Sequence, residues 1–242
     1  MSTGKGQVVE LILEDGCRHV RVSCPPNLIP SPGQYLLAGD TSDVPLPVPL
    51  FYTDSVPQGV TVGSWGHFIG AAQIPDSWHP GLELYLRGPL GRGFTLPLSA
   101  RRVGLIALDT SPARLKGLIR PALKQDAAVV LVGHSSPENL PDDVEVHPFS
   151  SLYEILEWAD YVACDVARED LPQLREQLGR LNQPPVGKAR PELSRNEAQI
   201  LVHTPVPCGG IADCGVCAVS LKSDWKLACK DGPVFDWSDI FR

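Results

Sequence analysis

The sequence predicts a fold of mixed class, α/β plus β, with an N-terminal antiparallel β-barrel, a parallel α/β sheet and a small C-terminal cysteine-rich domain. Three observations support this prediction. Residues 1–98 contain short alternating runs between Pro and Gly clusters, residues 99–182 alternate apolar runs with helical stretches, and four of the seven cysteines lie within 208–229. A chain of 242 residues can bury two modest cores and carry a short appendage.

The first segment, residues 1–98, is predicted to form strands only. Runs in which apolar and polar residues partly alternate lie at 8–13, 18–22, 59–63 and 82–87. No helical period of useful length interrupts these runs. A small antiparallel barrel is the simplest architecture for short strands that follow one another in this way.

The second segment, residues 99–182, is predicted to form a doubly wound sheet. The continuous apolar run at 102–108 is typical of a strand covered on both faces. Ser111 and Pro112 then predict the start of a helix over 113–124. Further strands are predicted at 128–132, 144–147 and 161–165, and further helices at 151–158 and 169–179. Strands that alternate with helices imply a parallel sheet.

The end of the chain is predicted to be a separate small domain behind a linker. Residues 183–196 are polar and Pro-containing, which indicates a linker, and a strand at 199–203 leads into the cysteine region. Outside that region, Cys164 lies in an apolar run and is expected to be buried as a small hydrophobic residue.

Composition excludes several classes of partner. The formal charge of −7 argues against nucleic acid, because phosphate binding needs a concentrated basic face. The longest apolar stretch, 127–132, is too short to span a bilayer, and no polybasic run suggests a membrane surface. The first residues carry no apolar core of a secretory signal. We therefore expect a cytoplasmic protein.

The spacing of Cys208, Cys214, Cys217 and Cys229 predicts a [2Fe–2S] cluster. Plant-type loops place four and then two residues between their first three cysteines, and here the gaps are five and two. Glycines 209, 210 and 215 would let the backbone take positive φ and direct N–H donors at the cluster. Structural zinc and unligated thiols are the alternatives, since Cys214 and Cys217 alone would serve as half of a Cys₄ zinc site.

Three stretches resemble the electron-transfer subunit of heteromeric dihydroorotate dehydrogenase, in the ferredoxin–NADP⁺ reductase superfamily. They are Pro32-Gly-Gln-Tyr-Leu36, Gly88-Pro-Leu-Gly-Arg-Gly-Phe94 and Ala228-Cys-Lys-Asp-Gly-Pro-Val-Phe235. The resemblance implies a flavin-binding-like barrel at 1–98, a nucleotide-binding-like domain at 99–182, and a [2Fe–2S] domain at 197–242. It also implies that electrons pass from a nicotinamide through FAD and the cluster to FMN in a partner subunit, in pyrimidine biosynthesis. The implied flavin contacts are Pro49, Leu50, Gly88, Pro89, Leu90 and Gly91.

The sequence departs from the family at both nucleotide sites. Where the family has Arg-Pro-x-Ser, this chain has Val48-Pro-Leu-Phe51, so a bound diphosphate would lack its bidentate arginine. The two alternatives are that the barrel still binds FAD and that it has lost FAD. The turn at 108–114 has no glycine and carries Asp109, and the family's Cys-Gly-Pro turn is Ala163-Cys-Asp-Val-Ala167. These changes predict that NAD(P) is not bound.

Function is therefore expected to lie in electron transfer, with little intrinsic NAD(P)H reductase activity and no catalytic side chain. The expected partner is a flavoprotein oxidoreductase, such as a dihydroorotate dehydrogenase-like catalytic subunit, docked around 209–216 and Trp225. For Trp225, Phe235 and Trp237, packing within the small domain is the alternative. Two other hypotheses are a scaffold or regulatory subunit with a structural cluster, and a diverged NAD(P)H–FAD reductase.

Overall fold

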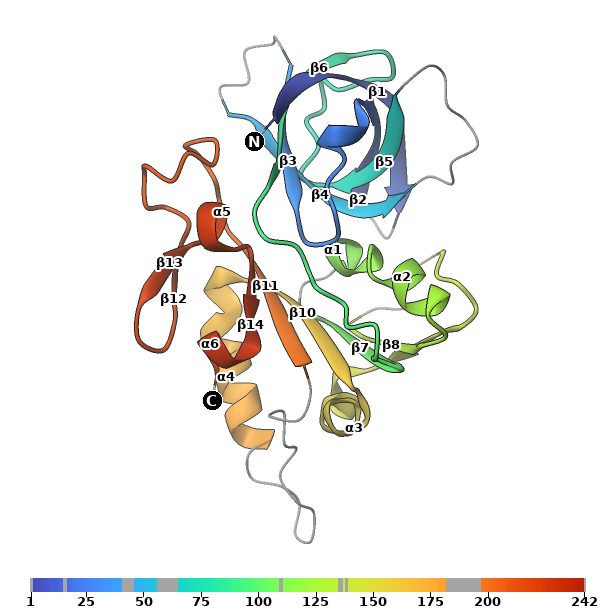
Figure 1. Ribbon diagram of the computed structural model, residues 1–242, viewed down its shortest axis with the longest axis vertical. Helices are drawn as coiled ribbons and strands as arrows, with labels where there is room; N and C mark the ends of the chain where they lie inside the picture. The colour runs from blue at the N-terminus through green and yellow to red at the C-terminus, as the bar shows by residue number, and fades with distance from the viewer. Residues whose placement is uncertain are drawn as a thin grey trace, which may run out of the picture.

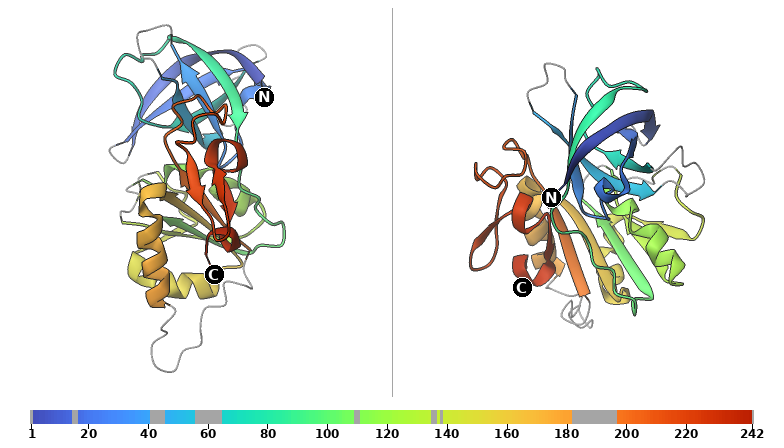
Figure 2. Two further views of the ribbon diagram at one scale, coloured as in Figure 1. Left: turned by 90° about the vertical axis from the view of Figure 1, so that its left-hand side faces the viewer. Right: turned by 45° about the horizontal axis from the view of Figure 1, so that its top comes forward.

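The computed structural model describes residues 2–14, 17–40, 46–55, 65–108, 111–134, 137, 139–181 and 197–241. A barrel and a sheet with helices are stacked, and the C-terminal segment lies beside both of them (Figure 1). The N-terminal strand belongs to the barrel, whereas the chain ends beside the sheet (Figure 2). This arrangement confirms the predicted fold class.

The barrel is closed and antiparallel, with the strand order β1-β2-β5-β4-β3-β6. Its strands are β1 (Ser2–Glu14), β2 (Cys17–Cys24), β3 (Tyr35–Gly39), β4 (Val48–Ser55), β5 (Gly66–Ala71) and β6 (Glu83–Leu90), and η1 (Pro26–Leu28) follows β2. Alternate side chains such as Val20, Leu36 and Phe68 fill its core. The run predicted as a strand at 59–63 lies outside the described residues.

The second sheet has six strands in the order β14-β11-β10-β7-β8-β9. These strands are β7 (Arg102–Ala107), β8 (Ala128–Val132), β9 (Val144–His147), β10 (Tyr161–Ala167), β11 (Glu197–His203) and β14 (Val234–Asp236). All neighbours pair in parallel except β11 and β14, which are antiparallel. The parallel α/β sheet is therefore confirmed, with one antiparallel strand at its edge.

Helices cover both faces of this sheet. They are α1 (Ala113–Lys116), α2 (Ile119–Lys124), η2 (Phe149–Ser151), α3 (Leu152–Trp158), η3 (Arg168–Asp170) and α4 (Leu171–Leu181). The single helix predicted over 113–124 is wrong, because the chain breaks into α1 and α2 around Gly117. At Gly117 an added Cβ would lie 2.7 Å from the Tyr52 ring, so close packing against the barrel requires glycine there.

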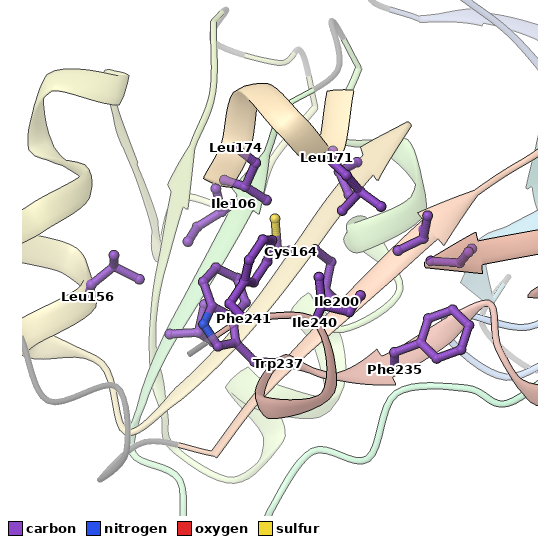
Figure 3. Close-up of a cluster of buried hydrophobic side chains, with 14 of the residues drawn as sticks. Ile106, Leu156, Cys164, Leu171, Leu174, Ile200, Phe235, Trp237, Ile240 and Phe241 are labelled. Carbon is purple, nitrogen blue, oxygen red and sulfur yellow. The ribbon is translucent and has the colours of Figure 1, made fainter. Parts of the chain in front are cut away.

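The C-terminal segment is joined to the sheet at its edge. It contains the hairpin β12 (Ala218–Ser220) and β13 (Trp225–Leu227), then α5 (Ala228–Asp231), β14 and α6 (Trp237–Ile240). Phe235, Trp237 and Phe241 pack with Cys164 and α4 in one buried core (Figure 3). Cys164 is fully buried, as expected, and the predicted linker 183–196 lies outside the described residues. The predicted domain boundaries remain predictions.

The barrel and the sheet meet along an apolar seam. Tyr35, Phe51 and Leu90 of the barrel form one buried cluster with Leu201 of β11 and Val234 of β14. Two ion pairs cross the same seam, from Lys116 Nζ to Glu14 Oε1 at 3.0 Å and from Arg120 Nε to Asp54 Oδ1 at 3.1 Å. The seam matters for function because the cysteine loop lies at one end of it. Within the described residues, no helix is long and apolar enough to cross a membrane.

Candidate metal centre

One loop and one short helix carry the four cysteines. Cys208, Cys214 and Cys217 lie between the end of β11 and the start of β12, and Cys229 lies on α5. The Ala228 N–H donates to the Cys217 carbonyl at 2.9 Å, which fixes α5 against the end of the loop. The fold therefore brings the distant Cys229 to the three clustered cysteines.

The thiols are arranged as two neighbouring pairs. The Sγ atoms of Cys217 and Cys229 are 3.2 Å apart, and both residues are buried. Cys208 is half-buried and hydrogen-bonded to the Cys214 side chain, which belongs to an exposed residue. One pair thus faces the protein interior and the other pair reaches toward solvent.

Backbone donors converge on these sulfurs because the loop is strongly curved. Glycines 209, 210 and 215 have φ of 65°, 72° and 70°, and Ala212 has φ of 62°. Backbone N–H groups of Ile211, Asp213 and Cys214 donate to the Cys208 sulfur, and that of Ala212 donates to the Cys229 sulfur. The expected positive φ at the three glycines is confirmed, and the loop forms a concave set of donors suited to an anion.

Cys208 and Cys229 differ in acidity. Burial raises the pKa of Cys208, but the backbone donors and the Cys214 thiol outweigh it and lower that pKa to about 6. Burial and, to a smaller extent, the adjacent Cys217 raise the pKa of Cys229 to about 12. A thiolate at Cys208 is therefore stabilised by the protein alone, whereas a thiolate at Cys229 needs a bound cation to stabilise it.

Contacts from the rest of the protein hold the loop in place. Arg168, which follows β10, donates through Nη1 to the carbonyl of Val216 and, at 3.4 Å, to that of Ala218. On the other side, the Arg92 N–H after β6 donates to the Gly232 carbonyl at 2.6 Å. Both the sheet and the barrel therefore contribute to the position of the cysteines.

The barrel also covers the inner side of the loop. A Cβ placed on Gly210 would lie 3.2 Å from Leu90 Cδ1 and 3.6 Å from the Tyr35 hydroxyl, and one on Gly209 would lie 3.6 Å from Arg87 Nη1. A side chain at Gly210 would therefore crowd Leu90 of the barrel, whereas a Cβ at Gly209 would make ordinary contact. On the outer side, the side chains of Ile211, Val216 and Trp225 are exposed.

The donor set fits an iron–sulfur cluster. Four thiols lie between converging N–H groups and a buried hydroxyl, and such donors stabilise the negative charge of a thiolate-bound cluster. Among the described residues, no group of three or more His, Cys, Asp or Glu side chains is arranged to hold a single metal ion.

The residues predicted to contact flavin do not form one open surface. Leu50 is buried in the barrel core and Leu90 in the seam, whereas Pro49 and Pro89 are half-buried. Gly88 and Gly91 are packed closely against other residues. A Cβ added at Gly88 would lie 2.5 Å from Leu36, and one added at Gly91 would lie 2.4 Å from Pro233. These contacts remain predictions.

Phe51, at the position of the family's serine, is covered from two sides. Its ring centroid lies 5.2 Å from that of Tyr35, and the Arg114 guanidinium carbon lies 5.8 Å from it. Arg114 Nε also donates to both carboxylate oxygens of Asp165, at 3.1 and 2.9 Å. This ion pair lies at the carboxyl ends of β7 and β10, where doubly wound sheets bind their ligands. Asp109 lies outside the described residues.

Comparison with known proteins decides the nature of the cysteine segment. A family model described as the iron–sulfur cluster binding domain of dihydroorotate dehydrogenase B matches residues 208–241. Residues 208–241 therefore form an iron–sulfur domain similar to that one. The chain is also similar to sulfhydrogenase 1 subunit gamma of Pyrococcus furiosus, at 55% identity over 31 residues. That match covers 13% of this chain and 11% of the relative, so this chain spans about a tenth of that protein's length.

Solved structures show the fold of the whole chain. An NADH-dependent reduced ferredoxin–NADP oxidoreductase matches with a TM-score of 0.71 at 15% identity, covering 99% of this chain and 90% of the other. The ferredoxin reductase of carbazole 1,9a-dioxygenase, in its FAD apo form, has a TM-score of 0.55 at 17% identity, covering 76% of this chain and 65% of the other. A ferredoxin NADP⁺ reductase from Neisseria gonorrhoeae has a TM-score of 0.53 at 11% identity, covering 84% of this chain and 98% of the other. The resemblance stated from sequence is thereby confirmed.

Sequence reasoning missed three contributors to the site. Tyr35 lay in a stretch recognised only for its family resemblance, Arg168 carried no motif, and Ala212 is not a residue type that signals positive φ. The aromatic alternatives are resolved residue by residue. Phe235 and Trp237 are buried packing residues, whereas Trp225 on β13 is 61% exposed.

Proposed function

We propose that this chain is an iron–sulfur electron-transfer protein that exchanges electrons with a partner flavoenzyme. One observation carries the proposal: three thiols of one loop and a fourth on α5 converge at a place that is covered by the barrel on one side and exposed on the other. When bound, the cluster would supply one-electron redox chemistry. The protein's own residues hold it, orient donors toward it and exclude water from its inner side.

The cluster is proposed to be of the [2Fe–2S] type, held by Cys208, Cys214, Cys217 and Cys229. Three cysteines in one loop and a fourth on a separate element follow the general plan of plant-type ligation. The backbone donors favour a group that carries negative charge on its sulfurs, whereas structural zinc sites usually pair two short cysteine knuckles. The loop supplies one such knuckle, at Cys214 and Cys217.

The residues at Phe51 do not fit the flavin contacts that the resemblance implies. Val48 and Phe51 offer neither a guanidinium nor a hydroxyl group, and Tyr35 and Arg114 already cover the Phe51 ring. We therefore propose that neither FAD nor NAD(P) binds tightly, although the fold is shared with flavin reductases. A diverged NAD(P)H–FAD reductase is the function favoured if flavin co-purifies.

The partner is proposed to dock over the exposed side of the loop. Ile211 and Val216 of the loop are 57% and 41% exposed near the exposed Cys214, and Trp225 on the adjoining β12–β13 hairpin is 61% exposed. Exposed apolar side chains that include a tryptophan are typical of an interaction site. The name of the similar sulfhydrogenase chain, subunit gamma, supports a subunit role. A dihydroorotate dehydrogenase-like catalytic subunit is one candidate partner, and a scaffold with a structural cluster is the rival function.

Anaerobic purification followed by visible spectroscopy tests the cofactor. Two irons and two acid-labile sulfides per chain, with [2Fe–2S] absorption and no flavin band, are the expected result. Stoichiometric zinc without labile sulfide would refute the cluster.

Affinity capture from the native host then tests the partner. Recovery of a flavoprotein that reduces or oxidises the bound cluster supports electron transfer. Recovery of the protein alone, with a cluster that no cellular flavoprotein reduces or oxidises, would favour the structural role.

A further inference from the structure

Tyr35 places a polar group at the inner side of the cysteine loop without an acceptor from the polypeptide. The residue, the first of β3, is 1% exposed, and its hydroxyl has no hydrogen-bond partner among the described residues. Buried tyrosine hydroxyls almost always have a partner, because desolvation without a new hydrogen bond is unfavourable. The hydroxyl therefore needs an acceptor that other side chains do not supply.

The geometry shows where that acceptor must lie. A Cβ placed on Gly210 would be 3.6 Å from the Tyr35 hydroxyl, so the phenol contacts the loop that carries Cys208. Leu90, which belongs to the same buried cluster as Tyr35, lies equally close to the loop, since a Cβ on Gly210 would be 3.2 Å from its Cδ1. The ring itself is held by Phe51, Leu90 and Val234. The cysteine segment lies directly against the barrel in two views (Figure 2).

We propose that the Tyr35 hydroxyl donates a hydrogen bond to a sulfur at the cluster site, either a sulfide or a cysteine thiolate, and so raises the cluster's reduction potential. This inference rests on the proposed function. Tyr35 is a tuning residue and not a catalytic one, because it acts through the cluster. This hydrogen bond would give the barrel a role in electron transfer that does not depend on flavin.

The direction of the effect follows from charge. Reduction adds an electron to a cluster whose sulfurs already carry negative charge, so a donor hydrogen bond stabilises the reduced form more than the oxidised form. Removing the donor should make the potential more negative. A tyrosine that served only to pack the seam would leave the potential unchanged when its hydroxyl is removed.

The variant Tyr35→Phe removes the hydroxyl and keeps the ring. Its cluster potential is measured on the full chain by an EPR-monitored redox titration. At fixed solution potential, the ratio of reduced to oxidised cluster should fall about threefold to tenfold, where tenfold corresponds to 59 mV for one electron. The matched control is Tyr85→Phe on β6, whose side chain is 50% exposed, and it should keep the wild-type potential.

Each outcome decides between the two proposals. Iron and sulfide in both proteins with equal potentials would overturn the inference and leave the proposed function standing. Absence of a cluster from the wild-type protein would overturn the proposed function itself.

If Tyr35→Phe loses its cluster, the wild-type chain labelled with 3-fluorotyrosine supplies the test. Fluorine makes the phenol a stronger donor, so a more positive potential supports the inference and an unchanged one overturns it.

Discussion

The buried pair of Arg114 and Asp165 should stabilise the protein strongly at the carboxyl ends of β7 and β10. The Asp165 side chain is 0% exposed and that of Arg114 17%, and both carboxylate oxygens accept from Arg114 Nε, at 3.1 and 2.9 Å. Asp165→Asn keeps the size but leaves the guanidinium beside a neutral amide. Removing one partner of a buried pair costs about 3–5 kcal/mol, and the partial exposure of Arg114 favours the lower figure.

A loss of about 3 kcal/mol should lower the melting temperature by roughly 6–12 °C in a chain of this size. Thermal unfolding followed by circular dichroism measures it. Glu83→Gln is the control, since Glu83 pairs with Lys5 where both side chains are more than half exposed, and exposed pairs contribute little. Adding Arg114→Met to Asp165→Asn should recover much of the loss, because no buried charge then lacks its partner. Equal melting temperatures for Asp165→Asn and Glu83→Gln would refute the reasoning.

Three further predictions concern the cluster, the nucleotide and the partner. Cys214→Ser should remove most of the iron and labile sulfide and destabilise the C-terminal domain. The control Cys17→Ser, on β2, should keep its iron and sulfide. Equal iron contents in the two variants would contradict the proposed ligands. The isolated protein should bind NADH and NADPH weakly and show little diaphorase activity, so a micromolar dissociation constant by calorimetry would show that the nucleotide edge is intact. Trp225→Ala should weaken partner binding about fivefold or more in surface plasmon resonance, whereas Leu13→Ala, an exposed barrel residue, should not; equal affinities would exclude the loop surface.

Much of the fold could be predicted because its strands are patterned locally. The continuous apolar runs at 102–108 and 128–132 became β7 and β8, since strands covered on both faces have no polar alternation. By contrast, β5 was missed because Gly66, His67 and Gly70 interrupt its apolar pattern. The split between α1 and α2 falls at Gly117, four residues before Pro121, which has no N–H to donate to the Gly117 carbonyl. The close approach of Tyr52 to Gly117 could not be predicted, because the two residues are distant in sequence.

The ligands of the candidate site could be predicted from the sequence, but the residues around them could not. Cysteine spacing alone indicated the loop, because thiols that bind one cluster must lie within reach of it. The buried or exposed state of Trp225, Phe235 and Trp237 could not be predicted, since all three lie in one short segment and differ only in tertiary contacts. The position of Tyr35 beside the loop could not be predicted either, because β3 and the loop are distant in sequence and meet only across the seam.

The pairing of β14 with β11 has a consequence for how the cofactor is acquired. These strands flank the loop, Leu201 pairs with Val234, and the Val202 N–H donates to the Pro233 carbonyl at 2.9 Å. The two ends of the cysteine loop are thus brought together by sheet hydrogen bonds, so loop closure does not depend on iron. Assembly machinery would then meet a preformed loop in a folded chain, and iron and sulfide could be delivered after translation to a site whose outer edge, at Cys214, is open to solvent.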